Sequence, residues 1–254
     1  MTRLLLILAL VLMPATATGE EDVVAGLSQN EVSITANFNG SEILIFGAVQ
    51  RFAPLPATGP MQVIVTIEGP DRPLTVRRKE RRYGIWMNTD SVEVDAAPTF
   101  YAVATTAPFE EVITHTEDLR HRISIPRAIR AVDTGIVRSE EFTEAVIRIR
   151  TAAGLYQMLE GAVTLRGETL FNTSIGLPAN LTEGDYVVRI FLTRDLQVVS
   201  SYQTDISVRK VGLERLIYTL AHERPLIYGL LSLAIAIAAG WGASAVFRYI
   251  RTGG

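Results

Sequence analysis

The 254-residue chain contains no cysteine, and its 24 Lys and Arg against 27 Asp and Glu give a formal net charge of −3. The absence of cysteine excludes disulfides, thiolate metal sites and thiol nucleophiles, and the lack of net positive charge argues against nucleic-acid binding. Hydrophobic residues make up 48% of the chain, which excludes a disordered protein, and the longest apolar runs lie at its two ends.

Residues 1–19 are predicted to be a secretory signal peptide. Arg3 forms the positively charged start, and the apolar run Leu4–Met13 follows. Small residues place the expected cleavage after either Ala17 or Gly19. The run of ten apolar residues is too short to cross a bilayer core of about 30 Å as a helix, so a retained anchor is the less favoured interpretation.

Residues 20–107 are predicted to form an immunoglobulin-like antiparallel β-sandwich unit. Apolar and polar residues alternate in short runs, and Gly, Pro and Asn separate the runs, as in sandwich proteins. The expected strands are Val32–Ala36, Glu42–Val49, Met61–Glu68, Leu74–Lys79, Tyr83–Met87 and Phe100–Thr105.

The densest charge run of the chain lies in this first unit, within residues 77–82. It supplies the candidate binding residues, which are Arg77, Arg78, Lys79, Arg81 and Arg82. A basic cluster outside the cytoplasm can bind an anionic ligand, lipid head groups or an acidic partner. Cations on a solvated strand also discourage aggregation between sheet edges, so a purely structural role is the alternative.

Residues 108–154 are predicted to be a helical insert. The expected helices cover Pro108–Arg122 and Pro126–Val132, and a third begins at Ser139. In that third helix an apolar face is predicted, formed by Phe142, Ala145, Val146 and Ile149.

Residues 155–210 are predicted to form a second β unit, with a single composite domain as the alternative. The expected strands are Ala162–Arg166, Thr169–Leu177, Tyr186–Thr193 and Val198–Val208. The segment Leu181–Tyr186 resembles a tyrosine corner, in which a tyrosine that enters a strand bonds back to the preceding turn.

Catalytic motifs are absent from the sequence. There is no G-x-S-x-G, no phosphate-binding glycine loop and no H-E-x-x-H. The one histidine cluster, from His115 to His121, includes Glu117 and Asp118, but we interpret it as a charged helix surface and assign no metal. We therefore predict no cofactor and no enzymatic activity.

Residues 211–224 are predicted to be a juxtamembrane amphipathic helix. Its apolar residues recur at helical spacing, which indicates a helix on the membrane surface or a helical stalk. These residues are Leu213, Leu216, Ile217 and Leu220.

Residues 225–250 are predicted to be a transmembrane helix. The segment Leu226–Phe247 is uncharged over 22 residues, and a helix needs roughly 17–25 residues to span a bilayer. A late apolar helix after a signal peptide stops transfer, so we expect the preceding domain in the periplasm and residues 251–254 as a cytoplasmic stub.

Small residues recur every four positions along this helix, at Ser232, Ala236, Gly240 and Ser244. Such a ridge allows a second helix to approach closely in lipid, where packing drives association. The ridge predicts helix packing, either in a homodimer or with another inner-membrane protein.

Several segments resemble the alphaproteobacterial putative transmembrane protein family. The similar segments are Val24–Ser28, Ile34–Ala48, Val76–Thr89, Ala97–Thr106, Leu177–Tyr186, Lys210–Arg215 and Leu226–Trp241. The resemblance implies a Gram-negative inner-membrane protein with a periplasmic domain. It also implies a role as an accessory to a transporter, because members of the family lie beside sulfite-exporter-like membrane proteins. It brings no assigned activity and therefore no catalytic residue.

Together these features predict a membrane-anchored periplasmic β-sandwich protein that acts by interaction, as an accessory subunit of an inner-membrane transporter. Two alternatives remain at this stage. One is a periplasmic sensor or small-anion-binding module that uses the basic run, and the other is an enzyme with an unrecognised site.

Overall fold

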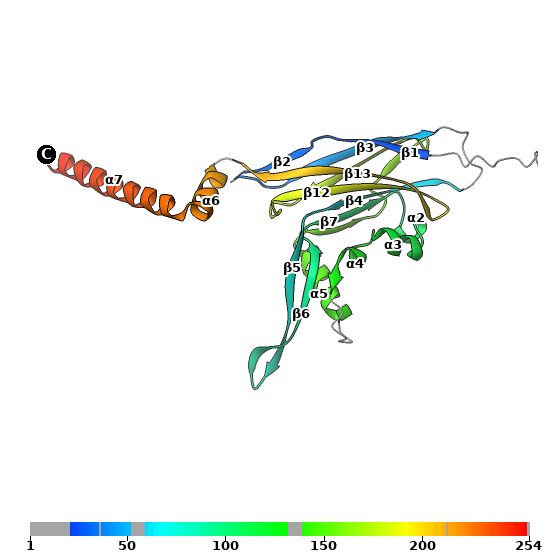
Figure 1. Cartoon of the computed structure of the whole chain (residues 1–254), viewed down its shortest axis with the longest axis horizontal. Coiled ribbons are helices and arrows are strands. Elements are labelled where there is room, and N and C mark those ends of the chain that lie inside the picture. The colour runs from blue at the N-terminus through cyan, green and yellow to red at the C-terminus, as the bar shows by residue number, and fades with distance from the viewer. Residues whose placement is uncertain (1–20, 36, 52–58, 132–138, 212, 253–254) are drawn as a thin grey trace, which may run out of the picture.

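The computed structural model describes residues 21–252 except 36, 52–58, 132–138 and 212 (Figure 1). The predicted signal peptide, both cleavage positions and the end of the predicted stub lie outside the described residues. For a few positions the backbone alone is described, and these are residues 131, 139, 213–216, 219 and 245–252.

Two β-sheets stack face to face and form the body of the molecule (Figure 1). One sheet has the order β1–β3–β11–β10, with strands Glu21–Leu27, Ser41–Arg51, Leu170–Leu177 and Thr164–Arg166. The other has the order β2–β13–β12–β4–β7–β9, with strands Glu31–Ile34, Gln197–Lys210, Gly184–Arg194, Met61–Glu68, Tyr101–Thr105 and Tyr156–Leu159. Pairing is antiparallel except between β13 and β2 and between β7 and β9, so the predicted β-sandwich class is confirmed.

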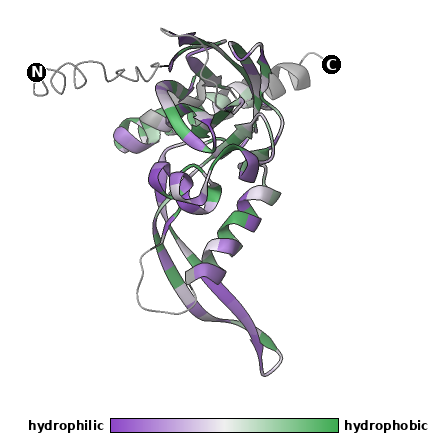
Figure 2. Cartoon of the chain, turned by 90° about the vertical axis from the view of Figure 1, so that its right-hand side faces the viewer, coloured by the Kyte–Doolittle hydropathy of each residue, from purple (hydrophilic) through white to green (hydrophobic). Residues whose placement is uncertain are grey.

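A third sheet extends away from this sandwich as a long hairpin (Figures 1 and 2). It consists of β5 (Asp71–Arg82), β6 (Ile85–Pro98) and the short β8 (Arg130–Ala131). The prediction of a strand over Tyr83–Met87 is wrong at its first two residues, because Tyr83 and Gly84 form the turn of the hairpin.

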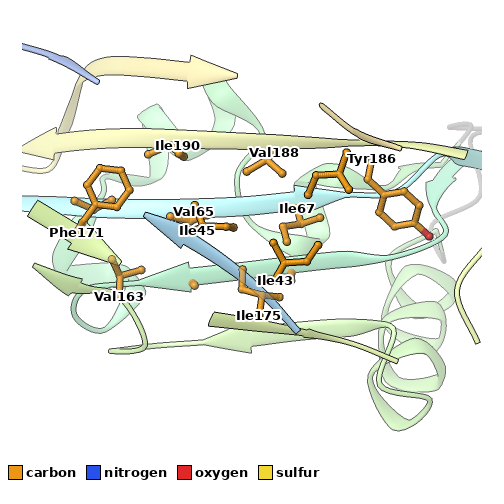
Figure 3. Close-up of a cluster of buried hydrophobic side chains, with 14 of the residues drawn as sticks. Ile43, Ile45, Val65, Ile67, Val163, Phe171, Ile175, Tyr186, Val188 and Ile190 are labelled. Atoms are coloured by element: carbon orange, nitrogen blue, oxygen red, sulfur yellow. The ribbon is translucent and has the colours of Figure 1, made fainter. Parts of the chain in front are cut away.

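The main core lies between the two stacked sheets (Figure 3). Alternate residues of each strand point into it, as the period of two in the sequence requires. The buried aliphatic side chains include Ile43, Ile45 and Ile175 of one sheet and Val65, Ile67, Val188 and Ile190 of the other.

Strands from the two predicted β units share both sheets. In one sheet β3 pairs with β11, and in the other β4 pairs with β12. Segments 20–107 and 155–210 therefore build one sandwich, the composite alternative, and do not fold as two β units. The physical reason is that each segment finds its hydrogen-bond partners in the other.

Helices cover the outer face of the six-stranded sheet and create a second core. They are α2 (Phe109–Val112), α3 (His115–His121), α4 (Ile125–Ala128) and α5 (Ser139–Ala152). Because both faces of β4 and β7 are covered, nearly every residue of these strands is buried, where one-sided burial would give alternation. In α5 the predicted face is correct at Phe142 and Val146 and wrong at Ile149, which is 61% exposed.

The predicted tyrosine corner is confirmed. The Tyr186 hydroxyl donates a 2.8 Å hydrogen bond to the carbonyl oxygen of Thr182, four residues upstream. The ring is buried in the main core, where it lies 6.1 Å from the ring of Phe100. This bond fixes the entry of the chain into β12.

Two helices follow the sandwich. They are α6 (Leu213–Glu223) and α7 (Pro225–Thr252), and they lie at one end of the molecule (Figure 1). The stretch Pro225–Ser244 is long and apolar enough to cross a membrane, and none of it is buried against the rest of the chain. The helices predicted over 211–224 and 225–250 are therefore present.

Candidate functional site

The β5–β6 hairpin ends in a tight turn with an unusual residue. Arg82 pairs with Ile85 across a turn of two residues, Tyr83 and Gly84, whose φ angles are +52° and +84°. Two left-handed residues match the twist of the flanking strands and favour Asn-Gly or Gly-Gly. Gly84 meets this requirement without cost, whereas Tyr83 carries a side chain in a strained conformation.

One face of the hairpin is braced by α5. Leu74 and Val76 pack against the second core, and Arg78 forms a 2.8 Å ion pair with Glu141 in the first turn of α5. Arg82 lies further along the same face and pairs with Glu80 at 3.4 Å. Two of the five candidate cations are therefore paired with carboxylates of the chain itself.

The other face carries a cationic stripe, which we define as Arg77, Lys79 and Arg81. Alternation along β5 places these three exposed side chains on the face opposite Arg78, and Trp86 lies opposite Arg81 in the ladder. Within the described part of the chain, no carboxylate lies at ion-pair distance from the cationic stripe. The fold thus pairs two cations of the basic run with carboxylates of the chain and exposes the other three to solvent.

Apolar side chains gather at the end of the hairpin, where no core covers them. We call Tyr83, Ile85, Trp86 and Met87 the hairpin tip; Tyr83 is fully exposed and Trp86 is 70% exposed. Figure 2 shows a hydrophilic arm with hydrophobic residues near its end. Large apolar residues gathered on a surface mark an interaction site, and sequence reasoning missed them because the pattern equally fits a buried strand.

A groove of about 430 Å³ lies between α5 and residues 76–79 of β5. Four of its lining residues are cationic and two are acidic. The cations are Arg77, Arg78, Lys79 and Arg148, and the acids are Glu141 and Glu144. The groove is large enough for a small anion, although Glu141 already takes up part of the positive charge.

A polar cluster lies where β4, β7 and β12 meet α3. Arg189 approaches Glu68 at 3.3 Å and donates hydrogen bonds to the Tyr101 hydroxyl and to the carbonyl oxygens of His121 and Arg122. Burial raises the pKa of Glu68 and, more strongly, that of Tyr101, and the nearby guanidinium opposes both shifts. Apart from the buried Nε of Arg189, which has no hydrogen-bond partner among the described residues, these groups are partnered within the chain, so the cluster fastens α3 to the sheet.

The histidine cluster is structural as well. Glu117 pairs with Arg120 at 2.6 Å and approaches His121 at 3.5 Å, and Asp118 accepts hydrogen bonds from the backbone of Ile123 and Ser124. Among the described residues, no group of three His, Asp or Glu side chains is arranged to hold a metal ion.

The small-residue ridge of α7 is not covered by any other part of the chain that the structure describes. Ser232, Ala236, Gly240 and Ser244 are all exposed. A Cβ atom built on Gly240 would meet no atom within 4 Å. The ridge is therefore accessible to another helix.

A family model matches most of this sequence. The model for the family Putative transmembrane protein (Alph_Pro_TM) matches residues 22–249, which contain the sandwich, the hairpin and most of α7. A search of the curated proteins found no match. This chain is a membrane-anchored member of the Putative transmembrane protein (Alph_Pro_TM) family.

Proposed function

We propose that this protein is a non-enzymatic accessory subunit of an inner-membrane transporter, of the sulfite-exporter-like kind, with its sandwich in the periplasm. The observation that carries the proposal is the small-residue ridge of α7, which is exposed along the membrane helix. Such a ridge suits close packing against a second membrane helix. The projecting hairpin adds exposed cations and large apolar side chains that belong to neither core.

The orientation follows from the predicted signal peptide and the late position of α7. Export of the N-terminal part leaves the sandwich outside and the last residues inside. Because the chain has no cysteine, a single cysteine introduced at Asn88 of the hairpin or at Gly254 reports its own side of the membrane. An impermeant maleimide should label the first variant in intact spheroplasts and should not label the second.

The partner is expected to dock on the small-residue ridge of α7. Packing of small residues, and not hydrophobicity, drives helix association in lipid. Gly240→Leu would block close approach of a second helix without a clash inside the chain, since the site is open. Ala238→Leu adds nearly as much volume, one carbon less than Gly240→Leu, on the opposite face of α7 and is the matched control.

The test is purification of the full-length protein from its native membrane in mild detergent, followed by mass spectrometry of what accompanies it. A stoichiometric membrane protein should accompany the wild type and Ala238→Leu, and its recovery should fall at least tenfold with Gly240→Leu. Equal recovery with Gly240→Leu would contradict docking through the ridge. Recovery of the chain with copies of itself alone would replace the transporter by a homodimer.

A second candidate function is binding of a small anion, and the groove between the hairpin and α5 favours it. Its four cationic side chains outnumber its two acidic side chains. Calorimetry of the full-length protein with sulfite, sulfate and phosphate tests this candidate. Heat of binding that disappears in Arg148→Gln would support the groove, and absence of heat with all three anions would count against it.

A further inference from the structure

We propose that the β5–β6 hairpin is a second membrane contact of this protein. The cationic stripe binds anionic phospholipid head groups of the bilayer that holds α7, and the hairpin tip enters the interfacial layer. The inference rests on the proposed function only for membrane anchoring and for the placement of the sandwich outside the membrane. It does not depend on a transporter partner.

The topology brings the hairpin and the anchor to the same end of the sandwich. β4 ends at Glu68, which pairs with Val187 near the start of β12, and Val187 in turn pairs with Asp205 near the end of β13. β5 begins directly after β4, and the chain enters α6 directly after β13. The base of the hairpin therefore lies at the sheet end from which the membrane anchor departs (Figure 1).

The bracing of the hairpin leaves the stripe uncovered. α5 packs against the face that carries Val76 and Arg78, and in Figure 1 it lies on the side of the hairpin away from α6 and α7. The cationic stripe occupies the opposite, exposed face, and two of its members, Arg77 and Lys79, also border the groove beside α5. Cations held near an anionic leaflet are attracted to it, and long Arg and Lys stems allow their charged groups to reach the head groups.

The residues of the hairpin tip suit the boundary between water and lipid. Trp and Tyr concentrate there because their rings are apolar and their N–H and O–H groups remain in contact with water. Ile85 and Met87 add apolar surface beside Trp86. Basic residues combined with exposed aromatic and aliphatic residues are typical of segments that lie in a membrane interface.

The conformation of the turn indicates that the aromatic ring of Tyr83 has a role other than folding. Folding alone favours Asn, Asp or Gly at the first residue of such a turn. Tyr83 occupies it with φ +52° and touches no core. A strained residue that remains fully exposed contributes to contact outside the chain and not to stability.

The observations favour a bilayer over a protein partner. The residues that dominate protein–protein binding lie in well-packed pockets from which water is excluded. The groove associated with this hairpin lies beside residues 76–79 on the α5 side and includes no residue of the hairpin tip, whereas the tip spreads its apolar groups around the end of a two-stranded ribbon. Apolar groups spread in this way can insert into the interface of a bilayer, and α7 anchors the chain in one.

The experiment uses the full-length protein carrying Trp241→Phe, so that Trp86 is the single tryptophan. The protein is reconstituted into vesicles of phosphatidylethanolamine and phosphatidylglycerol at 3:1, and into vesicles of phosphatidylcholine alone. Emission of Trp86, its quenching by lipids brominated near the head group and its quenching by aqueous acrylamide are measured. Low and high salt are compared.

In the anionic vesicles we expect a blue-shifted emission, quenching by the brominated lipids and protection from acrylamide. All three should weaken in phosphatidylcholine and in high salt, because salt screens exposed charges. Lys79→Gln combined with Arg81→Gln should lower the ratio of lipid-bound to free hairpin by roughly 30-fold, about fivefold per cation. Arg120→Gln combined with Arg166→Gln removes the same charge from exposed positions off the hairpin and should leave the ratio unchanged.

Three results would overturn the proposal. The first is a water-like, acrylamide-accessible Trp86 in both kinds of vesicle. The second is protection that does not respond to anionic lipid, salt or the stripe variant. The third is protection in detergent that rises with protein concentration, which would assign the tip to contact between copies. Loss of a transporter partner in the Gly240→Leu test would leave the Trp86 result unchanged, so the two proposals fail separately.

Discussion

At the residue scale, three tyrosines hold the sandwich and its helical layer together in the same way. Each ring is buried, and each hydroxyl donates to a backbone carbonyl oxygen: Tyr186 to Thr182, Tyr101 to Ile123 and Tyr156 to Pro98. A buried hydroxyl without a partner is costly, so these bonds allow the rings to be buried.

Tyr186→Phe removes the bond of the tyrosine corner and leaves the Thr182 carbonyl oxygen without this donor. We expect the free energy of unfolding to fall by about 1 kcal/mol, measured by denaturant titration. Tyr202→Phe is the control, since no hydrogen bond joins the Tyr202 hydroxyl to another described residue. An equal effect of both substitutions would contradict a specific role for the corner.

The burial of Tyr156 predicts a loss of stability in alkaline solution. Burial raises the pKa of this tyrosine to about 12, and the nearby Arg150 opposes the shift. The unfolded chain therefore ionises at lower pH than the folded one, and stability that is complete below pH of about 10 is lost as the pH rises toward 12. Tyr156→Phe should show a shallower loss than the wild type between pH 9.5 and about 11.5, as measured by chemical denaturation. Parallel curves would exclude Tyr156 as the cause.

We expect Tyr83 to lower the local stability of the hairpin while its ring provides a contact outside the chain. Tyr83→Asn suits the left-handed turn, so we expect the end of the hairpin to gain about 1 kcal/mol against local opening. Hydrogen exchange of the hairpin amides should slow about fivefold. Tyr83→Ala removes the ring without relieving the backbone and serves as the control. Faster exchange in Tyr83→Asn would show that the ring stabilises the hairpin after all.

At the element scale, a buried ion network ties the edge strand β1 to the opposite sheet. Glu21 of β1 and Arg194 of β12 are each 6% exposed at the side chain and lie 3.0 Å apart, and Arg51 of β3 contacts Glu21 at 2.9 Å. Arg194 also donates to the carbonyl oxygen of Gly59. The network fixes β1 at the end of the sandwich opposite the anchor.

Removal of the charge on Glu21 should be costly because it leaves Arg51 and Arg194 with Glu168 alone, a more exposed carboxylate at 3.9 Å from the one and 3.4 Å from the other. We expect Glu21→Gln to lower the free energy of unfolding by about 3 kcal/mol. The exposed pair of Arg209 and Asp185, at 2.7 Å, provides the control. Asp185→Asn should cost less than about 1 kcal/mol. Similar losses in both variants would show that burial of the network does not matter.

At the scale of the whole molecule, the interleaved strands make the sandwich a single folding unit. A fragment of residues 20–107 lacks β11 and β12, which are direct neighbours of β3 and β4. Loss of both partners exposes the inner faces of these strands. We therefore expect the fragment to be unfolded by circular dichroism and amide chemical-shift dispersion. A cooperatively folded fragment would restore the model of two separate β units.

Local chemistry made part of this architecture readable from the sequence. The tyrosine corner was found because its bond joins Tyr186 to a residue four positions away. The membrane helix was found because the length of the uncharged apolar run matches the thickness of a bilayer core. Ile149 was placed wrongly because helical spacing defines a face but not the width of the surface that covers it.

The sequence by itself determined most of the strands, the two terminal apolar segments and the positions of the five cations, since each depends on neighbours along the chain. Tertiary structure alone decided that both β segments share one sandwich, because strand pairing joins residues more than a hundred positions apart. It also decided the division of the basic run. The packing of α5 against one face of the hairpin pairs Arg78 with Glu141 and leaves Arg77, Lys79 and Arg81 to the solvent.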